Sequence, residues 1–111
     1  MKLGIFLVLF GERSLEEALD FVKSAGVQAV EIGTGGYPGT RHVNAREVVD
    51  DAAAIARIRD AVESRGLTIS ALSCHGNPLH PDKATAQSYH EDFVATVKLA
   101  QKLGVDTVIT F

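Results

Sequence analysis

The densest group of chemically versatile side chains is the ten-residue stretch Ser-Cys-His-Gly-Asn-Pro-Leu-His-Pro-Asp, residues 73–82. It follows an apolar run, and its two prolines restrict the backbone, which suits a loop that holds polar groups in place. His75 can serve there as a metal ligand, a general acid or base, or a donor to a substrate hydroxyl. A histidine that is hydrogen-bonded within a loop explains the same pattern. His75 is therefore a candidate catalytic residue and no more.

Three other residues of this stretch differ in the chemistry that they suggest. Asn77 and His80 are candidates for substrate binding, although asparagine before proline is also common turn chemistry. Cys74 has the opposite strand parity to His75, which predicts a small buried thiol facing the helices rather than a nucleophile. It is the only cysteine of the chain, which excludes an internal disulfide and a cysteine-rich zinc site.

Two further polar segments carry weaker signals. The glycine-rich residues 33–40 lack the Gly-Lys-Ser/Thr ending of a phosphate-binding loop and are predicted to be a flexible connection. Arg41 and His42 follow this segment and are positioned either to reach an anionic substrate or to lie in solvent. His90 is expected on the solvent face of a helix, beside two acidic residues.

A repeated pattern predicts the elements that position these side chains. Gly26, Gly66 and Gly104 each end a stretch of helical apolar spacing, and a short strand follows each glycine. Ser14 and Glu17 predict a capping box at the start of the first helix. The predicted strands are 3–9, 29–33, 68–74 and 107–111. The apolar residues that mark the second and third helices are Ile55, Ile58 and Val62, then Phe93, Val97 and Ala100.

The glycines lie 40 and 38 residues apart, by subtraction of their numbers. Helices that alternate with buried strands at this interval indicate βαβ units and parallel pairing, in either an open doubly wound sheet or a closed barrel. The turn at residues 10–13 lacks the glycine fingerprint of dinucleotide folds, and a flavodoxin-like domain of this length normally ends on a helix. We therefore predict an α/β fold with the order β-α-β-α-β-α-β.

This order predicts the N-terminal half of a (β/α)₈ barrel, because a complete barrel needs about 250 residues. Residues 1–111 are expected to form a single segment of four strands and three helices, truncated from a larger barrel, with open edges on the first and fourth strands.

Side chains alternate across a strand, so the repeats also predict which residues face inward. Val30 and Ile32 face the helices, and Glu31 then points into the barrel together with Ser73 and His75. We favour a structural Glu31, hydrogen-bonded to a neighbouring strand, over a substrate contact. The positions that the glycine alignment makes equivalent are Glu31, Ala71 and Ile109, and two residues later Gly33, Ser73 and Phe111.

Composition limits the partners that the chain is expected to bind. Its 111 residues, 46% hydrophobic and 23% charged, have the balance of an ordinary globular domain. A formal charge of −3 without a Lys/Arg cluster argues against nucleic acid. The apolar N-terminal run is far shorter than the ~20 residues that span a bilayer, and no small-residue cleavage site follows it. We expect a cytoplasmic protein without a membrane partner.

The opening strand, residues 26–32 and 67–73, and above all the loop His-Gly-Asn-Pro-Leu-His-Pro at residues 75–81 resemble the xylose-isomerase-like superfamily, specifically its sugar phosphate isomerase/epimerase branch. The resemblance implies a barrel enzyme in which a divalent cation, commonly Mn²⁺, Mg²⁺ or Co²⁺, polarises the oxygens of a sugar or sugar phosphate. Carboxylates then move a proton through an enediolate.

The family's metal ligands, Glu, Asp, His and Glu, come from later strands of the barrel. The resemblance therefore implies no metal ligand and no bound metal on this chain alone, which we expect to be inactive by itself. What carries over is a substrate-facing wall: His75 with its loop, and the aromatic residues Phe6 and Phe111 at strand ends.

Two other functions remain open. Zinc-dependent endonucleases that act at abasic DNA sites share the fold, and His75 matches in position the histidine that binds metal after their third strand. The acidic balance and the lack of a basic face count against this alternative. The third function is a non-catalytic half-barrel whose open strand edges make it self-associate or bind a missing C-terminal half. The sequence does not choose the sugar, nor between isomerisation, epimerisation and cleavage of glycosidic bonds.

Overall fold

Four parallel strands form one sheet, and their order in the sheet is their order in the chain. The computed structural model describes residues 1–111 and contains β1 (Gly4–Phe6), β2 (Ala29–Gly36), β3 (Thr68–His75) and β4 (Val108–Ile109). Helical segments connect the strands, so the fold is α/β, as predicted. A sheet of this kind whose strand order never reverses is the arrangement of half a TIM barrel, because a doubly wound sheet reverses at its switch point.

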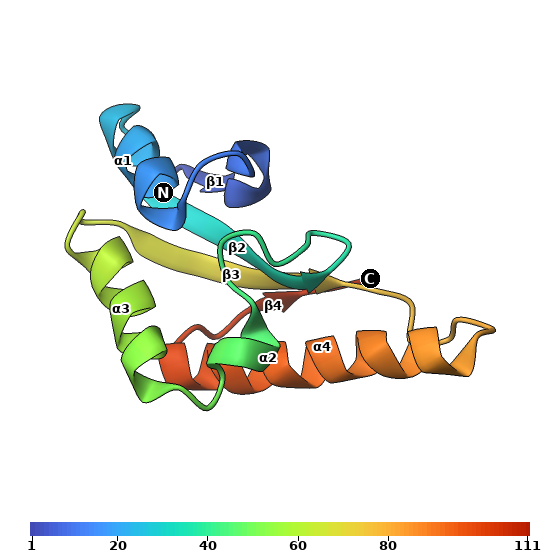
Figure 1. Ribbon diagram of the computed structural model, residues 1–111. Helices are drawn as coiled ribbons and strands as arrows, with labels where there is room; N and C mark the ends of the chain where they lie inside the picture. Colours follow the sequence, from blue (N-terminus) through green and yellow to red (C-terminus); the bar gives the residue numbers. More distant parts are fainter.

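The helical segments are the 3₁₀ helix η1 (Leu7–Phe10), α1 (Leu15–Ser24), α2 (Ala45–Val48), α3 (Ala52–Glu63) and α4 (Lys83–Leu103). The longest of them, α4, runs along β3 and β4 in Figure 1, and the short α2 lies against it. None of these helices combines the length and the hydropathy that crossing a membrane requires. The sequence prediction of three helices omitted α2, whose four residues are too few to show helical apolar spacing.

Polar side chains begin the helices as the sequence predicts. The Ser14 hydroxyl accepts a hydrogen bond from the Glu17 amide at 3.1 Å, and Asp82 accepts one from the Thr85 amide at 2.8 Å. The capping box is half formed, because the Glu17 carboxylate makes no return hydrogen bond. The three glycines that end the longer helices all have positive φ angles, between 71° and 79°.

The core lies between the sheet and the helices and contains 19 buried residues. Val30 and Ile32 of β2 are completely buried in it, as is Leu72 of β3, so these side chains face the helix layer. The predicted parity of Val30 and Ile32 is therefore correct. The pairing of Glu31 with Ala71, and of Gly33 with Ser73, is also as predicted.

Strand β1 is shorter than the predicted strand 3–9, because the chain turns into η1 at Leu7. Only three residues of β1 pair with β2. The tighter helical turn lets Leu7 become completely buried while Val8 and Leu9 remain exposed. A uniformly apolar run does not distinguish a strand from such a turn.

Strand β2 is longer than predicted and continues to Gly36. Residues 34–36 therefore also belong to the sheet, and the prediction of a flexible connection was wrong for them. The extension ends in a glycine with a φ angle of 64°, which pairs with His75.

The last two elements also differ in detail from the sequence prediction. On α4, Phe93 and Val97 are 36% and 45% exposed, whereas Thr96, Leu99 and Ala100 are buried. The inward stripe includes a threonine, which a search for apolar residues passes over. In the sheet, Ile109 of β4 pairs with Ser73, whereas the sequence predicted Ile109 at the same position along its strand as Ala71. This register differs by two residues from the predicted one, so the parity of the strand is unchanged.

Candidate functional site

The candidate residues on the strands lie at two levels of the sheet. Phe6, Glu31 and Ala71 form one row across β1, β2 and β3. His75 ends β3, four residues beyond Ala71. At the rise of a strand this separation is about 13 Å. The fold therefore places Glu31 within the sheet and His75 at its carboxyl end, where barrel enzymes bind their substrates.

Glu31 is held by a hydrogen bond across the two central strands. The Ser73 hydroxyl, which is completely buried, donates to Glu31 Oε1 at 2.6 Å. This is the contact with a neighbouring strand that the sequence favours for Glu31. Phe6 and Glu31 also line a hollow of about 510 Å³ near the amino ends of the strands. Glu31 therefore has a hydrogen-bond partner on the neighbouring strand and lies below the strand ends.

His75 is half-buried and packs against an aromatic ring. Its imidazole and the Phe111 ring have centroids 4.9 Å apart and planes inclined by 31°. Its Nδ1 atom is buried and has no hydrogen-bond partner in the protein. Buried polar atoms in proteins are nearly always hydrogen-bonded, so the unpaired Nδ1 sets His75 apart from the other candidate residues.

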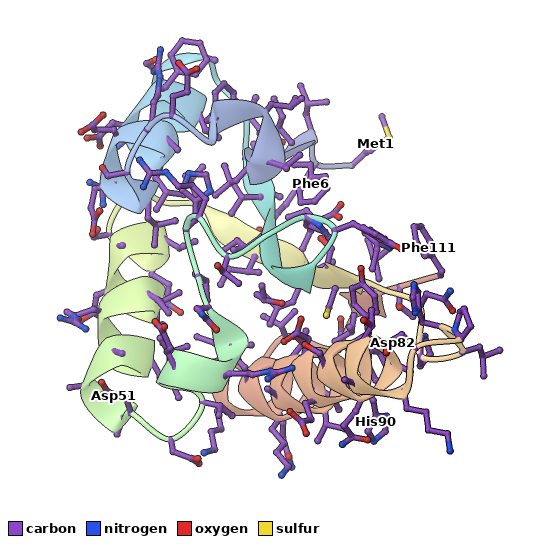
Figure 2. All side chains as sticks on the ribbon, turned by 45° about the vertical axis from the view of Figure 1, so that its right-hand side comes forward. Met1, Phe6, Asp51, Asp82, His90 and Phe111 are labelled. Carbon is purple, nitrogen blue, oxygen red and sulfur yellow. The ribbon has the colours of Figure 1, made fainter.

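Two tyrosines complete an aromatic cluster around Phe111. The Tyr37 ring centroid lies 5.3 Å from that of Tyr89 and 5.8 Å from that of Phe111. The neighbouring Tyr37 side chain raises the pKa of Tyr89. Figure 2 shows Phe111 beyond the end of the sheet, on the same side as the loop that contains Asp82.

Neither tyrosine is among the candidate residues that the sequence indicates. An extension of the second strand to Gly36 would have placed Tyr37 at a strand end beside His75. Tyr89 carries no such signal, because it lies in the middle of a helix and reaches the cluster only through tertiary packing.

Asn77 and His80 make the hydrogen bonds of the turn that they occupy. Asn77 Oδ1 accepts from the Leu79 amide at 3.1 Å, and His80 Nδ1 accepts from the Asp82 amide at 3.0 Å. These bonds fix the shape of the loop after His75. They leave the Asn77 amide nitrogen and His80 Nε2 without partners in the protein, on a loop that borders the strand ends.

Arg41 and His42 lie apart from this cluster. Arg41 Nε donates to the Gly11 carbonyl at 2.6 Å. His42 Nε2 lies 3.1 Å from the carbonyl oxygens of Phe10 and Arg13, and it must donate because carbonyls only accept. The two side chains join the segment after β2 to the turn after η1. His90 is exposed on α4, as predicted, and it lines a hollow together with Tyr89 and Phe111.

Cys74 faces the helices and is 2% exposed, as the parity argument predicts. Burial raises the pKa of its thiol, so less of the reactive thiolate is present at a given pH.

We expect Cys74 to react with a disulfide reagent at pH 8 at least ~100-fold more slowly in the folded chain than in the urea-unfolded chain, because local opening must come first. Absorbance of the released thiolate measures both rates, and Cys74→Ser provides the blank. Equal rates in the two states would mean that the thiol is not buried.

No group of three or more His, Cys, Asp or Glu side chains is arranged to hold a metal ion. Glu31 and His75, the two inward-facing residues with suitable chemistry, lie at the two different levels described above. The residues present therefore do not form a metal site by themselves.

Comparison with known proteins gives two matches. Residues 19–111 match a family model described as a xylose isomerase-like TIM barrel. The protein named Uncharacterized protein YfiH, from Bacillus subtilis (strain 168), is 33% identical over 109 residues, which cover 98% of this chain and 34% of that protein. The chain thus spans about a third of the length of this curated relative.

Proposed function

The chain belongs to the xylose isomerase-like TIM barrel family, and from this premise we propose that it forms the substrate-facing wall of a metal-dependent sugar or sugar phosphate isomerase or epimerase. The observation that carries the proposal is His75. It lies at the carboxyl end of β3, with a buried Nδ1 that lacks a partner and a ring packed on Phe111. A polar atom next to an aromatic surface suits a sugar, which offers hydroxyl groups and apolar C–H faces together.

Each residue of the wall has a separate task in this proposal. His75 binds a substrate oxygen and stabilises the negative charge that develops on it when a neighbouring carbon loses its proton to form an enediolate. Phe111 packs against the sugar ring, and Phe6 belongs to the lower row of the wall. Asn77 and His80 border the opening. Glu31 keeps its hydrogen bond to Ser73 and supports the sheet beneath the substrate.

A divalent cation, Mn²⁺, Mg²⁺ or Co²⁺, would polarise the oxygens of the sugar when bound. Because the residues of this chain do not form a ligand set, we propose that its ligands belong to other strands of a complete barrel. The same view accounts for the two outer strands, since β1 and β4 each pair with one neighbour only. We propose that their open edges pair with further strands, either of a longer chain or of a second copy.

The proposal predicts exchange of a carbon-bound proton with solvent. A fusion in which residues 1–111 replace the matching 109 residues of the Bacillus subtilis relative is incubated with Mn²⁺ in D₂O, with a panel of aldoses, ketoses and their phosphates. We expect proton NMR to show deuterium at the carbon next to the carbonyl of at least one sugar. His75→Ala should lower the exchange rate by about 100-fold, the usual effect of losing a positioned acid or base.

Gln101→Ala is the control, because this residue is exposed near the other end of α4, away from the strand ends, and its loss should leave the rate unchanged. The proposal fails if the folded, Mn²⁺-loaded fusion exchanges no proton of any sugar in the panel. It also fails for His75 in particular if both variants exchange as fast as the fusion itself.

A further inference from the structure

The end of β2 is fixed to α4 by a carboxylate that the proposed site does not include. Asp92 Oδ2 accepts a hydrogen bond from the Gly36 amide at 3.1 Å. Its other oxygen, Oδ1, lies 2.6 Å from Arg46 Nε. A Cβ atom on Gly35 would lie 3.1 Å from the Asp92 Cβ, so strand and helix approach as closely as a glycine allows. Asp92 thus joins β2, α2 and α4.

A second polar contact lies one helical turn further along α4. Thr96 and Thr34, both buried, share a hydrogen bond of 2.8 Å between their hydroxyl oxygens. Residues 92 and 96 are separated by about 6 Å along a helix, and residues 34 and 36 by about 7 Å along a strand. The two spacings match, so α4 holds β2 at two successive points. These contacts explain why the strand continues to Gly36 instead of ending at Gly33.

Gly36, at the end of β2, and Tyr37, which follows it, also contact the backbone of His75. Gly36 pairs with His75 in the sheet, and the Tyr37 amide donates to the His75 carbonyl at 2.7 Å. A chain of contacts therefore runs from the Asp92 carboxylate through the Gly36 amide and the Tyr37 amide to the backbone of His75. This chain is short and contains only one flexible side chain.

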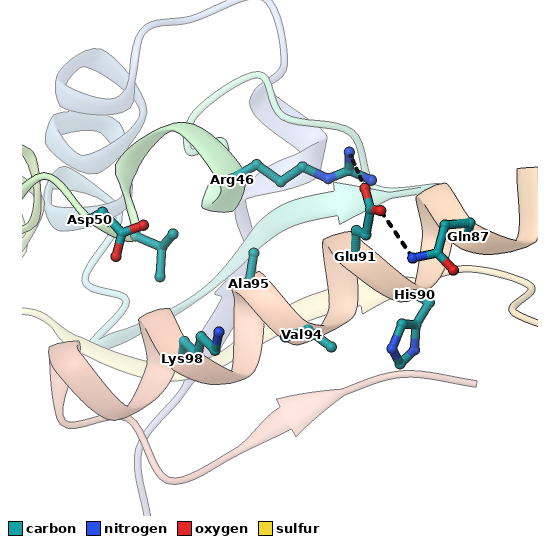
Figure 3. A pocket seen from close by; sticks show the side chains of 9 residues that line it. Arg46, Asp50, Gln87, His90, Glu91, Val94, Ala95 and Lys98 are labelled. Carbon is teal, nitrogen blue, oxygen red and sulfur yellow. Dashed lines mark hydrogen bonds and ion pairs between the residues drawn. The ribbon is translucent and has the colours of Figure 1, made fainter. Parts of the chain in front are cut away.

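We propose that Asp92 is a positioning residue for His75: its carboxylate fixes the Gly36 amide, which orients the end of β2 against the His75 backbone. Arg46 in turn holds the carboxylate. Its guanidinium also pairs with Glu91 at 3.1 Å and donates to the Ser88 hydroxyl at 3.1 Å. Figure 3 shows Arg46 reaching from α2 across α4 toward Glu91. This arrangement matters for catalysis only if the proposed function is correct. The positioning of His75 by Asp92 does not depend on the proposed function.

Asp92→Asn tests the proposal in the chain of residues 1–111. It keeps the shape of the side chain but removes the charge that strengthens the bond to Gly36 and the pair with Arg46. We expect the Gly36 and Tyr37 amides to exchange with D₂O about tenfold faster. The imidazole proton signals of His75 should shift or broaden in the same variant, which a purely structural role elsewhere in α4 would not cause.

Glu91→Gln is the matched control. Glu91 pairs with the same guanidinium from the adjacent position of α4 but has no contact with β2. It should leave both amides and the His75 signals unchanged. If Asp92→Asn does not fold, a scalar coupling between the Gly36 nitrogen and the Asp92 carboxyl carbon in the unmodified chain still reports the bond, and its absence overturns the proposal.

Two other results would overturn it. One is an equal acceleration of exchange at all amides of Asp92→Asn, which would indicate only a loss of overall stability. The other is faster exchange at Gly36 with unchanged His75 signals, which would mean that Asp92 holds β2 without positioning His75. Because these measurements need no substrate, a failure here is distinct from a failure of the proposed enzymatic activity.

Discussion

Gly36→Ala is expected to lower the free energy of unfolding by more than about 3 kcal/mol, or to leave the chain unfolded. Gly36 has a φ angle of 64°, in the left-handed region that side chains other than hydrogen disfavour. A Cβ atom there would lie 2.0 Å from the His75 carbonyl oxygen and 2.8 Å from its carbonyl carbon. Both are backbone atoms of a paired strand, so they cannot move aside without breaking the end of the β2 and β3 pairing.

Urea denaturation followed by circular dichroism measures this loss. Gly39→Ala is the matched control, because Gly39 has a similar φ angle of 78° but no atom within 4 Å of the position that a Cβ would take. It should cost only the conformational penalty of about 1 kcal/mol. If the two variants were equally stable, the close contact between Gly36 and His75 would not exist in solution.

Leu99→Ala is expected to destabilise the chain by about 2 to 5 kcal/mol, the usual range for truncating a buried leucine. Leu99 is completely buried in the core, on the face of α4 that packs against the sheet. Removing its side chain leaves a cavity that β-strands on the other side cannot close without distorting their pairing. The midpoint of urea unfolding should fall while the slope of the transition remains the same.

Comparing Leu99→Ala with Val97→Ala tests which face of α4 packs against the sheet. Val97 is 45% exposed, and alanine is the better helix former, so the variant should stay within about 0.5 kcal/mol of the original chain. The apolar spacing of the sequence predicts the opposite ranking, because it assigns Val97 to the inward face. A large loss for Val97→Ala with a small loss for Leu99→Ala would show that α4 is rotated from the orientation described here.

The repeated helix, glycine and strand units were predictable because each is encoded locally. Gly26, Gly66 and Gly104 end helices through their own backbone preferences, and the strands that follow are short and apolar. The parity of Glu31 and Ser73 followed from simple alternation, and their hydrogen bond agrees with it. Where an element depends on its own residues, the sequence predicts it well.

The differences arise where tertiary contacts decide the outcome. β2 reaches Gly36 because Asp92 and Thr96 hold it from a helix about 60 residues later in the chain, and no local pattern contains that information. For the same reason, the sequence predicted only some members of the aromatic cluster around Phe111. Phe111 stood at an expected strand end, whereas Tyr37 and Tyr89 reach it from elements whose ends and orientations depend on packing.

The agreement between strand order and chain order also bears on how the protein folds. Paired residues of the sheet are never more than 40 positions apart, and each new strand joins the one made just before it. The loop that must close for each pairing is therefore of similar, moderate length. On a ribosome, each strand and helix unit can add to the unit already formed as soon as it emerges, so assembly can keep pace with synthesis.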